Sequence, residues 1–191
     1  AAQHLREPVA RRAAIGDAAR MARRTREMIA GAGIDCELVT GAGTGTWQHE
    51  RDSGAYDELQ PGSYVFMDAD YGRNIAAPDE LRFEQSLYVL ASVVSVPAPE
   101  RAIVDAGLKA FSFDSGLPLA RGRAGVEYVK ASDEHGVLAV APDAPPLRSD
   151  ERVFLIPGHC DPTVNLYDYL VAVRDGVVEG VWPIEARGAL G

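Results

Sequence analysis

The sequence predicts an α/β segment followed by an antiparallel β domain, on two observations. From Pro8 to Ala30 apolar residues recur at helical spacing, and a short strand and a Gly-rich loop follow this helix. After Phe83 the chain changes to strand-like stretches separated by turn signals, and none keeps a helical period long enough for a crossover helix. The change falls near residues 75–85, so we place the domains at 1–80 and 81–191.

The first segment is expected to begin with the long helix. Pro8 suits a first helical turn, which does not need its missing N–H, and Gly31-Ala32-Gly33 ends the helix. The mixture of Arg and Ala over residues 11–26 predicts that its arginines lie on a solvated face. Strands are expected at 35–40 and 63–68. Two strands are too few for an independent sheet, so we expect further sequence before residue 1.

The second segment is expected to consist of strands, with no helix longer than two turns. Asp175-Gly176 between two β-rich runs is its clearest hairpin signal. The predicted strands cover residues 86–97, 102–105, 126–131, 137–141, 152–156, 169–174 and 177–182.

Composition limits the partners and the compartment. The chain has 191 residues, 47% of them hydrophobic, and a formal charge of −9, which disfavours nucleic acid because such binding depends on cationic side chains. Its apolar runs are too short to span a bilayer, so no membrane partner is expected. The two cysteines, Cys36 and Cys160, lie far apart in sequence and cannot form a disulfide framework, so we expect a reducing compartment and a cytoplasmic protein.

The Gly-rich loop and the start of the chain hold the first candidate site. Backbone N–H groups and Thr hydroxyls in the segment Gly41–Thr46 can cradle a phosphate without a Lys, although such a loop is more often only a turn. His4 precedes the long helix, where an α/β unit has a strand end facing its site, and is a candidate general base. His49, in a polar stretch, is expected to be solvated.

The second candidate site is a metal site at His159 and Asp161. In an extended or turn backbone residues two apart point to the same side, and an imidazole with a carboxylate suits Mn²⁺ or Zn²⁺. The alternative is a loop histidine capped by a nearby Asp. Cys160 is expected to be a small buried residue rather than a ligand.

Five motifs, in order along the whole chain, resemble the D-threonine aldolase family. They are Gly41–Thr46, Glu58–Tyr71, Val104–Lys109, Ser132–Gly136 and Pro157–Leu166. That family is similar to alanine racemase and to metal-dependent D-serine dehydratases. The resemblance implies the C-terminal strands of a pyridoxal-phosphate-binding (β/α)8 barrel, followed by an antiparallel β domain with a metal site.

The resemblance also implies roles for individual residues. The cofactor phosphate would be held by Gly43, Thr44 and Gly45, with Asp68 and Tyr71 closing the adjacent strand end. His159 and Asp161 would bind the metal, Mn²⁺ first and Zn²⁺ or Mg²⁺ as alternatives, and His4 would be the base near the substrate hydroxyl. The Schiff-base lysine would lie in a missing N-terminal barrel half, since neither Lys109 nor Lys130 has a suitable context.

The implied function is that of a lyase of D-amino acid metabolism, an aldolase that cleaves a β-hydroxy-D-amino acid to glycine and an aldehyde and forms a homodimer. These residues do not separate D-threonine from D-3-hydroxyaspartate as substrate. One alternative is a D-serine dehydratase. The resemblance implies a Cys at the second metal-ligand position of those enzymes, whereas this chain has Asp161 there. The other is a non-catalytic metal-binding or dimerisation fragment.

Overall fold

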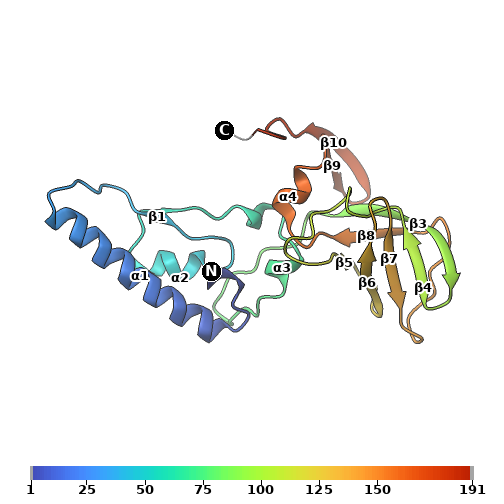
Figure 1. Cartoon of the computed structure of the whole chain (residues 1–191), viewed down its shortest axis with the longest axis horizontal. Coiled ribbons are helices and arrows are strands. Elements are labelled where there is room, and N and C mark those ends of the chain that lie inside the picture. Colours follow the sequence, from blue (N-terminus) through green and yellow to red (C-terminus); the bar gives the residue numbers. More distant parts are fainter. Residues whose placement is uncertain (1, 190–191) are drawn as a thin grey trace. The chain divides into compact units, whose positions relative to one another are not determined.

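The structure is a computed structural model that describes residues 2–189, and the chain divides between Ser86 and Leu87 into two compact units. The first contains η1 (Ala2–His4), α1 (Pro8–Gly31), β1 (Thr40–Gly41), α2 (Trp47–Ser53), β2 (Glu58–Leu59), η2 (Ser63–Val65) and α3 (Ala69–Gly72) (Figure 1). The second contains β3 (Val89–Ala98), β4 (Arg101–Val104), β5 (Leu119–Ala120), β6 (Val126–Ala131), β7 (Gly136–Val140), β8 (Arg152–Ile156), α4 (Cys160–Val164), β9 (Tyr169–Arg174) and β10 (Val177–Pro183). The predicted class, α/β followed by antiparallel β, is confirmed.

Helix α1 has nearly the predicted bounds, with Pro8 in its first turn. It packs on α2, and Ile15 and Ala19 are buried. The prediction of a fully solvated arginine face is wrong for Arg11, which is only 2% exposed. Its guanidinium lies 2.9 Å from Glu80, and this pairing makes its burial tolerable.

The strands of the first unit are much shorter than predicted. β1 and β2 pair in parallel over two residues each. The strand predicted at 63–68 is wrong, because the N–H groups of Phe66 and Met67 donate to the Ser63 carbonyl at 3.1 and 2.6 Å. Met67 also has a left-handed φ of 57°, which ends any extended run. A continuous apolar stretch of this length therefore forms a tight turn here.

The second unit contains a closed barrel of six strands, in the order β3-β4-β7-β6-β5-β8. Every neighbouring pair is antiparallel. All the strands predicted after residue 85 are present within three residues of their predicted ends, and only the short β5 was not predicted. Helix α4, of five residues, is the longest helix in residues 87–189.

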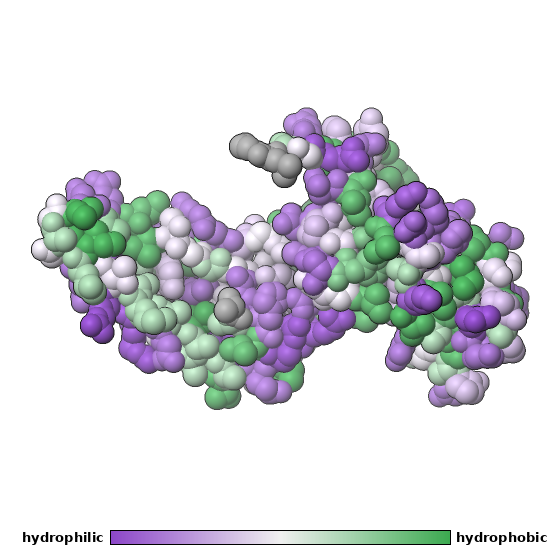
Figure 2. All heavy atoms as spheres, viewed as in Figure 1, coloured by the Kyte–Doolittle hydropathy of each residue, from purple (hydrophilic) through white to green (hydrophobic). Residues whose placement is uncertain are grey.

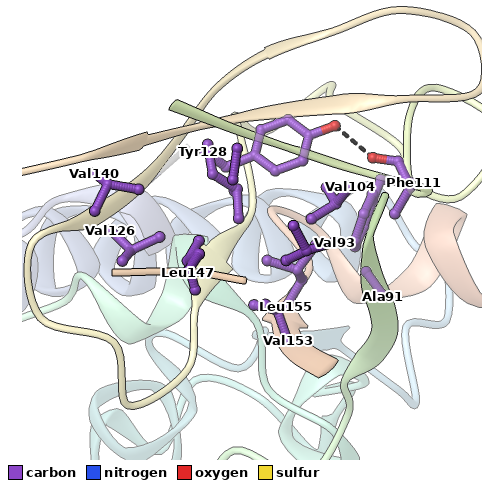
Figure 3. Packing of buried hydrophobic residues seen from close by; sticks show 13 residues of the cluster. Ala91, Val93, Val104, Phe111, Val126, Tyr128, Val140, Leu147, Val153 and Leu155 are labelled. Carbon is purple, nitrogen blue, oxygen red and sulfur yellow. Dashed lines mark hydrogen bonds between the residues drawn. The ribbon is translucent and has the colours of Figure 1, made fainter. Parts of the chain in front are cut away.

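The barrel encloses the main hydrophobic core (Figure 3). Val93, Val104, Leu138 and Leu155 are fully buried. The hydroxyl of Tyr128 donates to the Ala106 carbonyl at 2.7 Å, and burial raises the pKa of this tyrosine to about 12. The barrel is thus closed around apolar side chains with its one buried phenol hydrogen-bonded.

Strands β9 and β10 form a hairpin outside the barrel. Asp175 and Gly176 have φ values of 50° and 78°, the signs that a two-residue type I′ turn requires, so the predicted turn is confirmed. Figure 2 shows hydrophobic surface in the first unit where α1 ends and the next loop begins, the region in which Met28 and Ile34 are exposed. No helix between residues 2 and 189 is both long and apolar enough to span a membrane.

Candidate functional site

The Gly-rich loop turns sharply between β1 and α2. The N–H groups of Thr46 and Trp47 donate to the Gly43 carbonyl at 3.1 and 3.0 Å. Within the described residues, the N–H groups of Thr44 and Gly45 donate no hydrogen bond. The Oγ1 of Thr44 accepts the N–H of Tyr64 at 3.1 Å, which leaves the hydroxyl proton of Thr44 able to donate. The loop thus offers an anion two backbone donors and one hydroxyl donor.

A cavity of about 230 Å³ in the first unit is lined in part by Thr44, Gly45 and Tyr71, which the sequence had assigned to one site. Glycine is required at position 45, because a Cβ there would lie 2.5 Å from the carbonyl oxygen of Gln3 and 3.0 Å from Asn74 Nδ2. The loop therefore closes directly on the segment that carries His4. A phosphate group fits this set of donors.

A buried carboxyl group, Glu50, lies beside the loop. The hydroxyl of Thr46 donates to Glu50 Oε2 at 2.8 Å, so this threonine is already engaged. Burial is the main cause that raises the pKa of Glu50 above its ordinary value of 4.5.

Asp68 and Tyr71 lie together at α3. The carboxylate of Asp68, 1% exposed, accepts the N–H of Tyr71 at 2.9 Å and caps the helix. The hydroxyl of Tyr71 donates to Gln3 Oε1 at 2.8 Å, and its ring stacks on His4 with centroids 5.6 Å apart. Asp68 therefore acts on the cavity through the position of Tyr71.

His4 is held by a buried carboxylate that the sequence reasoning missed. Its Nδ1 lies 2.6 Å from Asp70 Oδ2, and Arg6 pairs with the other oxygen of Asp70. Burial alone would raise the pKa of Asp70, but Arg6 and His4 outweigh burial and hold this pKa below 3.8. Because the ionised carboxylate accepts the Nδ1 proton, the Nε2 of His4 carries the lone pair.

A second buried cluster lines the same cavity. His49 was expected to be solvated, but only 10% of its side chain is exposed, and its Nε2 lies 2.8 Å from Glu80 Oε1. Arg11 pairs with the other oxygen of Glu80. Burial alone would raise the pKa of Glu80, but the N–H of Ala77 and the charges of Arg11 and His49 outweigh it and lower this pKa below 4.5. The cluster ties α1 and α2 to the loop that carries Glu80.

The second unit carries the predicted metal ligands. An extended or turn backbone was predicted for 159–161; His159 is extended, with φ −138°, and is the N-cap residue of α4, so Cys160 and Asp161 lie in the helix. Asp161 is exposed in the first turn of α4, and Cys160 is buried at 2% exposure, as predicted. No group of three potential metal ligands occurs within residues 2–189. Two ligands from this chain leave further positions for water or substrate.

His159 also has a carboxylate partner, Asp114, which lies 45 residues away in sequence. Asp114 Oδ2 lies 2.6 Å from His159 Nδ1. Burial alone would raise the pKa of Asp114, but hydrogen bonds from Ser112, His159 and Ser115 lower it to about 2. No motif marked Asp114, whereas Asp70 lies between Asp68 and Tyr71, the two residues that the resemblance assigned to the site.

Comparison with known proteins identifies aldolase relatives. A 3-hydroxy-D-aspartate aldolase of Paracoccus denitrificans is 50% identical over 169 residues, which is 86% of this chain and 43% of that protein. A D-threonine aldolase of Arthrobacter sp. is 47% identical over 186 residues, which is 97% of this chain and 49% of that protein. The chain thus spans about half the length of the curated relatives it matches. The family model "Putative serine dehydratase domain" matches residues 86–173.

Solved structures give the same picture. A crystal structure of D-threonine aldolase from Filomicrobium marinum matches 100% of this chain and 52% of its own, with a TM-score of 0.94 and 41% identity. D-threo-3-hydroxyaspartate dehydratase from Delftia sp. HT23 matches 90% of this chain and 51% of its own, with a TM-score of 0.73 and 26% identity. Two further structures of this dehydratase are a cysteine-to-alanine mutant in a metal-free form and a mutant of the histidine two positions earlier.

The fold is that of the C-terminal part of the alanine racemase-like proteins. Within that class, the aldolases match nearly the whole chain at 41–50% identity, whereas the dehydratase matches at 26%. The chain is similar to the C-terminal half of D-threonine aldolase and of 3-hydroxy-D-aspartate aldolase.

Proposed function

We propose that this chain is the C-terminal half of a pyridoxal-phosphate- and metal-dependent lyase that cleaves a β-hydroxy-D-amino acid to glycine and an aldehyde. One observation carries the proposal. His4, oriented by buried Asp70, stacks on Tyr71, and Tyr71 lines the same cavity as the free N–H group of Gly45. A base and a phosphate-sized donor set thus lie side by side in one unit. The aldolase relatives support the same reaction.

The Gly-rich loop would hold the cofactor phosphate. Gly43 makes the turn, Thr44 and Gly45 provide the donors, and Asp68 keeps Tyr71 against the cavity. When bound, pyridoxal phosphate supplies an electron sink for the charge left at the substrate Cα. Lys109 is exposed and pairs with Glu134, so we assign the covalent lysine to the N-terminal half, outside this chain.

His159 and Asp161 would bind the metal. In the dehydratase, the mutated histidine and the cysteine whose mutant is metal-free have the same spacing, which supports this assignment. A bound divalent cation would supply Lewis-acid activation of an oxygen ligand. An imidazole with a carboxylate favours Mn²⁺, with Zn²⁺ and Mg²⁺ as alternatives.

His4 would take the proton of the substrate β-hydroxyl. Asp70 keeps the Nδ1 proton of His4 in place, so Nε2 is the atom that accepts. With half of its side chain exposed, His4 is accessible to a substrate. Removal of this proton lets the Cα–Cβ bond break, with the aldehyde carbonyl forming at Cβ.

Dehydration is the second candidate function, favoured by the serine dehydratase family model and by the dehydratase structure. We place it second for two reasons. This chain has Asp161 at the second metal-ligand position, where a Cys is expected in the dehydratases. The aldolases are also more similar to this chain in sequence than the dehydratase is. A non-catalytic metal-binding or dimerisation role is the third. The homodimer, the cytoplasmic location and the choice of metal and substrate stay predictions.

The test uses the whole gene product that contains this chain, loaded with pyridoxal phosphate and Mn²⁺. Cleavage of D-threonine should yield glycine and acetaldehyde, EDTA should abolish it, and Mn²⁺ should restore it. Formation of 2-oxobutanoate and ammonia instead would establish the dehydratase. If neither D-threonine nor D-3-hydroxyaspartate is cleaved or dehydrated, the non-catalytic role remains.

A further inference from the structure

We infer that Asp114 is a positioning residue for His159: it holds the Nδ1 proton and so presents the opposite ring nitrogen, Nε2, to a divalent cation. The inference rests on the proposed metal site. It adds a residue that no sequence motif marked.

The contact fixes the tautomer of the histidine. Asp114 Oδ2 lies 2.6 Å from His159 Nδ1, and an ionised carboxylate can only accept a hydrogen bond. The Nδ1 of a neutral His159 must therefore carry the proton. The lone pair then lies on Nε2, which is the form of imidazole that binds metals, and metal-binding histidines regularly donate their other N–H to such a carboxylate.

Asp114 is itself held in place. The hydroxyl of Ser112 donates to its Oδ1 at 2.6 Å, and that of Ser115 donates to its Oδ2 at 3.2 Å. Both oxygens are thus engaged, and the carboxylate cannot rotate away from His159 without losing hydrogen bonds. A partly exposed pair of this kind contributes little to stability, so its organisation points to orientation of the imidazole.

The two segments that carry the pair are also locked together. The N–H of Ser112 donates to Thr163 Oγ1 at 3.2 Å, and Thr163, on α4, is fully buried. A Cβ at Gly158 would collide with the carbonyl oxygen of Gly116, so only glycine allows these two segments of the chain to approach this closely. The backbone on both sides therefore sets the distance between Asp114 and His159.

The test measures the affinity of the purified protein for Mn²⁺ by calorimetry, with the Co²⁺ absorption spectrum as a second readout. Asp114→Ala should weaken Mn²⁺ binding about 10- to 100-fold and change the Co²⁺ spectrum. Asp114→Asn, whose amide oxygen still accepts the Nδ1 proton, should recover most of the affinity. Asp143→Ala, at an exposed Asp elsewhere in the same unit, is the matched control and should bind as the wild type does.

The outcomes separate the inference from the metal site. If His159→Ala loses Mn²⁺ while Asp114→Ala binds it as tightly as the wild type, the inference is wrong and the metal site stands. If Asp114→Ala is misfolded by circular dichroism, Ser112→Ala replaces it, with a weaker loss of affinity expected and no loss refuting the inference. If neither the wild type nor the variants bind Mn²⁺ or Co²⁺, both the metal site and the inference are wrong.

Discussion

Substitution of Gly158 by Ala should disrupt metal binding by separating two loops, without touching a ligand. An added Cβ would lie 2.9 Å from the carbonyl carbon of Gly116 and nearer still to its oxygen. Ordinary contacts begin at 3.4 Å, so the two backbones must separate by at least 0.5 Å. The atoms in the way are backbone, which cannot swing aside as a side chain can.

This displacement acts on the pair beside it. His159 follows Gly158 directly, and its 2.6 Å contact with Asp114 crosses the same gap between the loops. Separation lengthens or breaks this hydrogen bond and frees the imidazole to rotate. We expect Mn²⁺ affinity to fall about 10- to 100-fold, as for loss of the carboxylate itself. Overpacking should also lower the free energy of unfolding by about 1–3 kcal/mol.

Calorimetric titration with Mn²⁺ and denaturant unfolding measure the two effects separately. The matched control is Gly107→Ala, whose Cβ would lie 2.6 Å from the N of His135 and 2.8 Å from the carbonyl carbon of Glu134. It should destabilise the protein to a similar extent and leave Mn²⁺ affinity within about twofold. Equal losses of affinity in both variants, or full affinity in Gly158→Ala, would refute the reasoning.

Three further predictions concern groups with shifted pKa values or oriented protons. Asp70→Ala should lower kcat of the whole enzyme by about 10²-fold, the low end of what a general base contributes, and leave KM nearly unchanged, because the Nδ1 of His4 loses its acceptor and the ring its fixed tautomer; unchanged kcat would remove His4 as the base. The lowered pKa of Glu80 stabilises the folded state above about pH 4.5, and this stability is lost as pH falls through the pKa of Glu80 in the folded state. In Glu80→Gln the free energy of unfolding, measured with denaturant, should therefore fall less steeply from pH 6 to 3. Tyr128→Phe should lower the free energy of unfolding by about 1 kcal/mol at pH 7. Because the pKa of Tyr128 is raised to about 12, this tyrosine ionises at pH 11 in the unfolded wild type first, and the loss should be smaller there. The same loss at both pH values would contradict this reasoning.

The strands of the second unit could be predicted because turn residues separate the strand-like stretches, even though the barrel also pairs strands far apart in sequence, such as β3 with β8. The segments 126–131 and 152–156 have their predicted bounds, since turn residues mark both ends of each. The first unit was harder. A strand needs a neighbour for its backbone hydrogen bonds, and within the described residues the segment predicted at 35–40 finds one only at its end, where β1 pairs with β2.

The same distinction explains what could be seen of the candidate sites. His159 and Asp161 lie two positions apart in sequence and are chemically typical of a metal site, so their spacing alone suggested them. Asp114 and Asp70 reach their histidines from 45 and 66 residues away, and only the folded chain makes them neighbours. In both cases a carboxylate accepts the Nδ1 proton of the neutral imidazole and leaves Nε2 available, for the proposed cation at His159 and for the proposed substrate proton at His4. A sequence pattern can thus indicate which imidazole carries the chemistry, while the nitrogen that performs it is determined by a contact between distant residues.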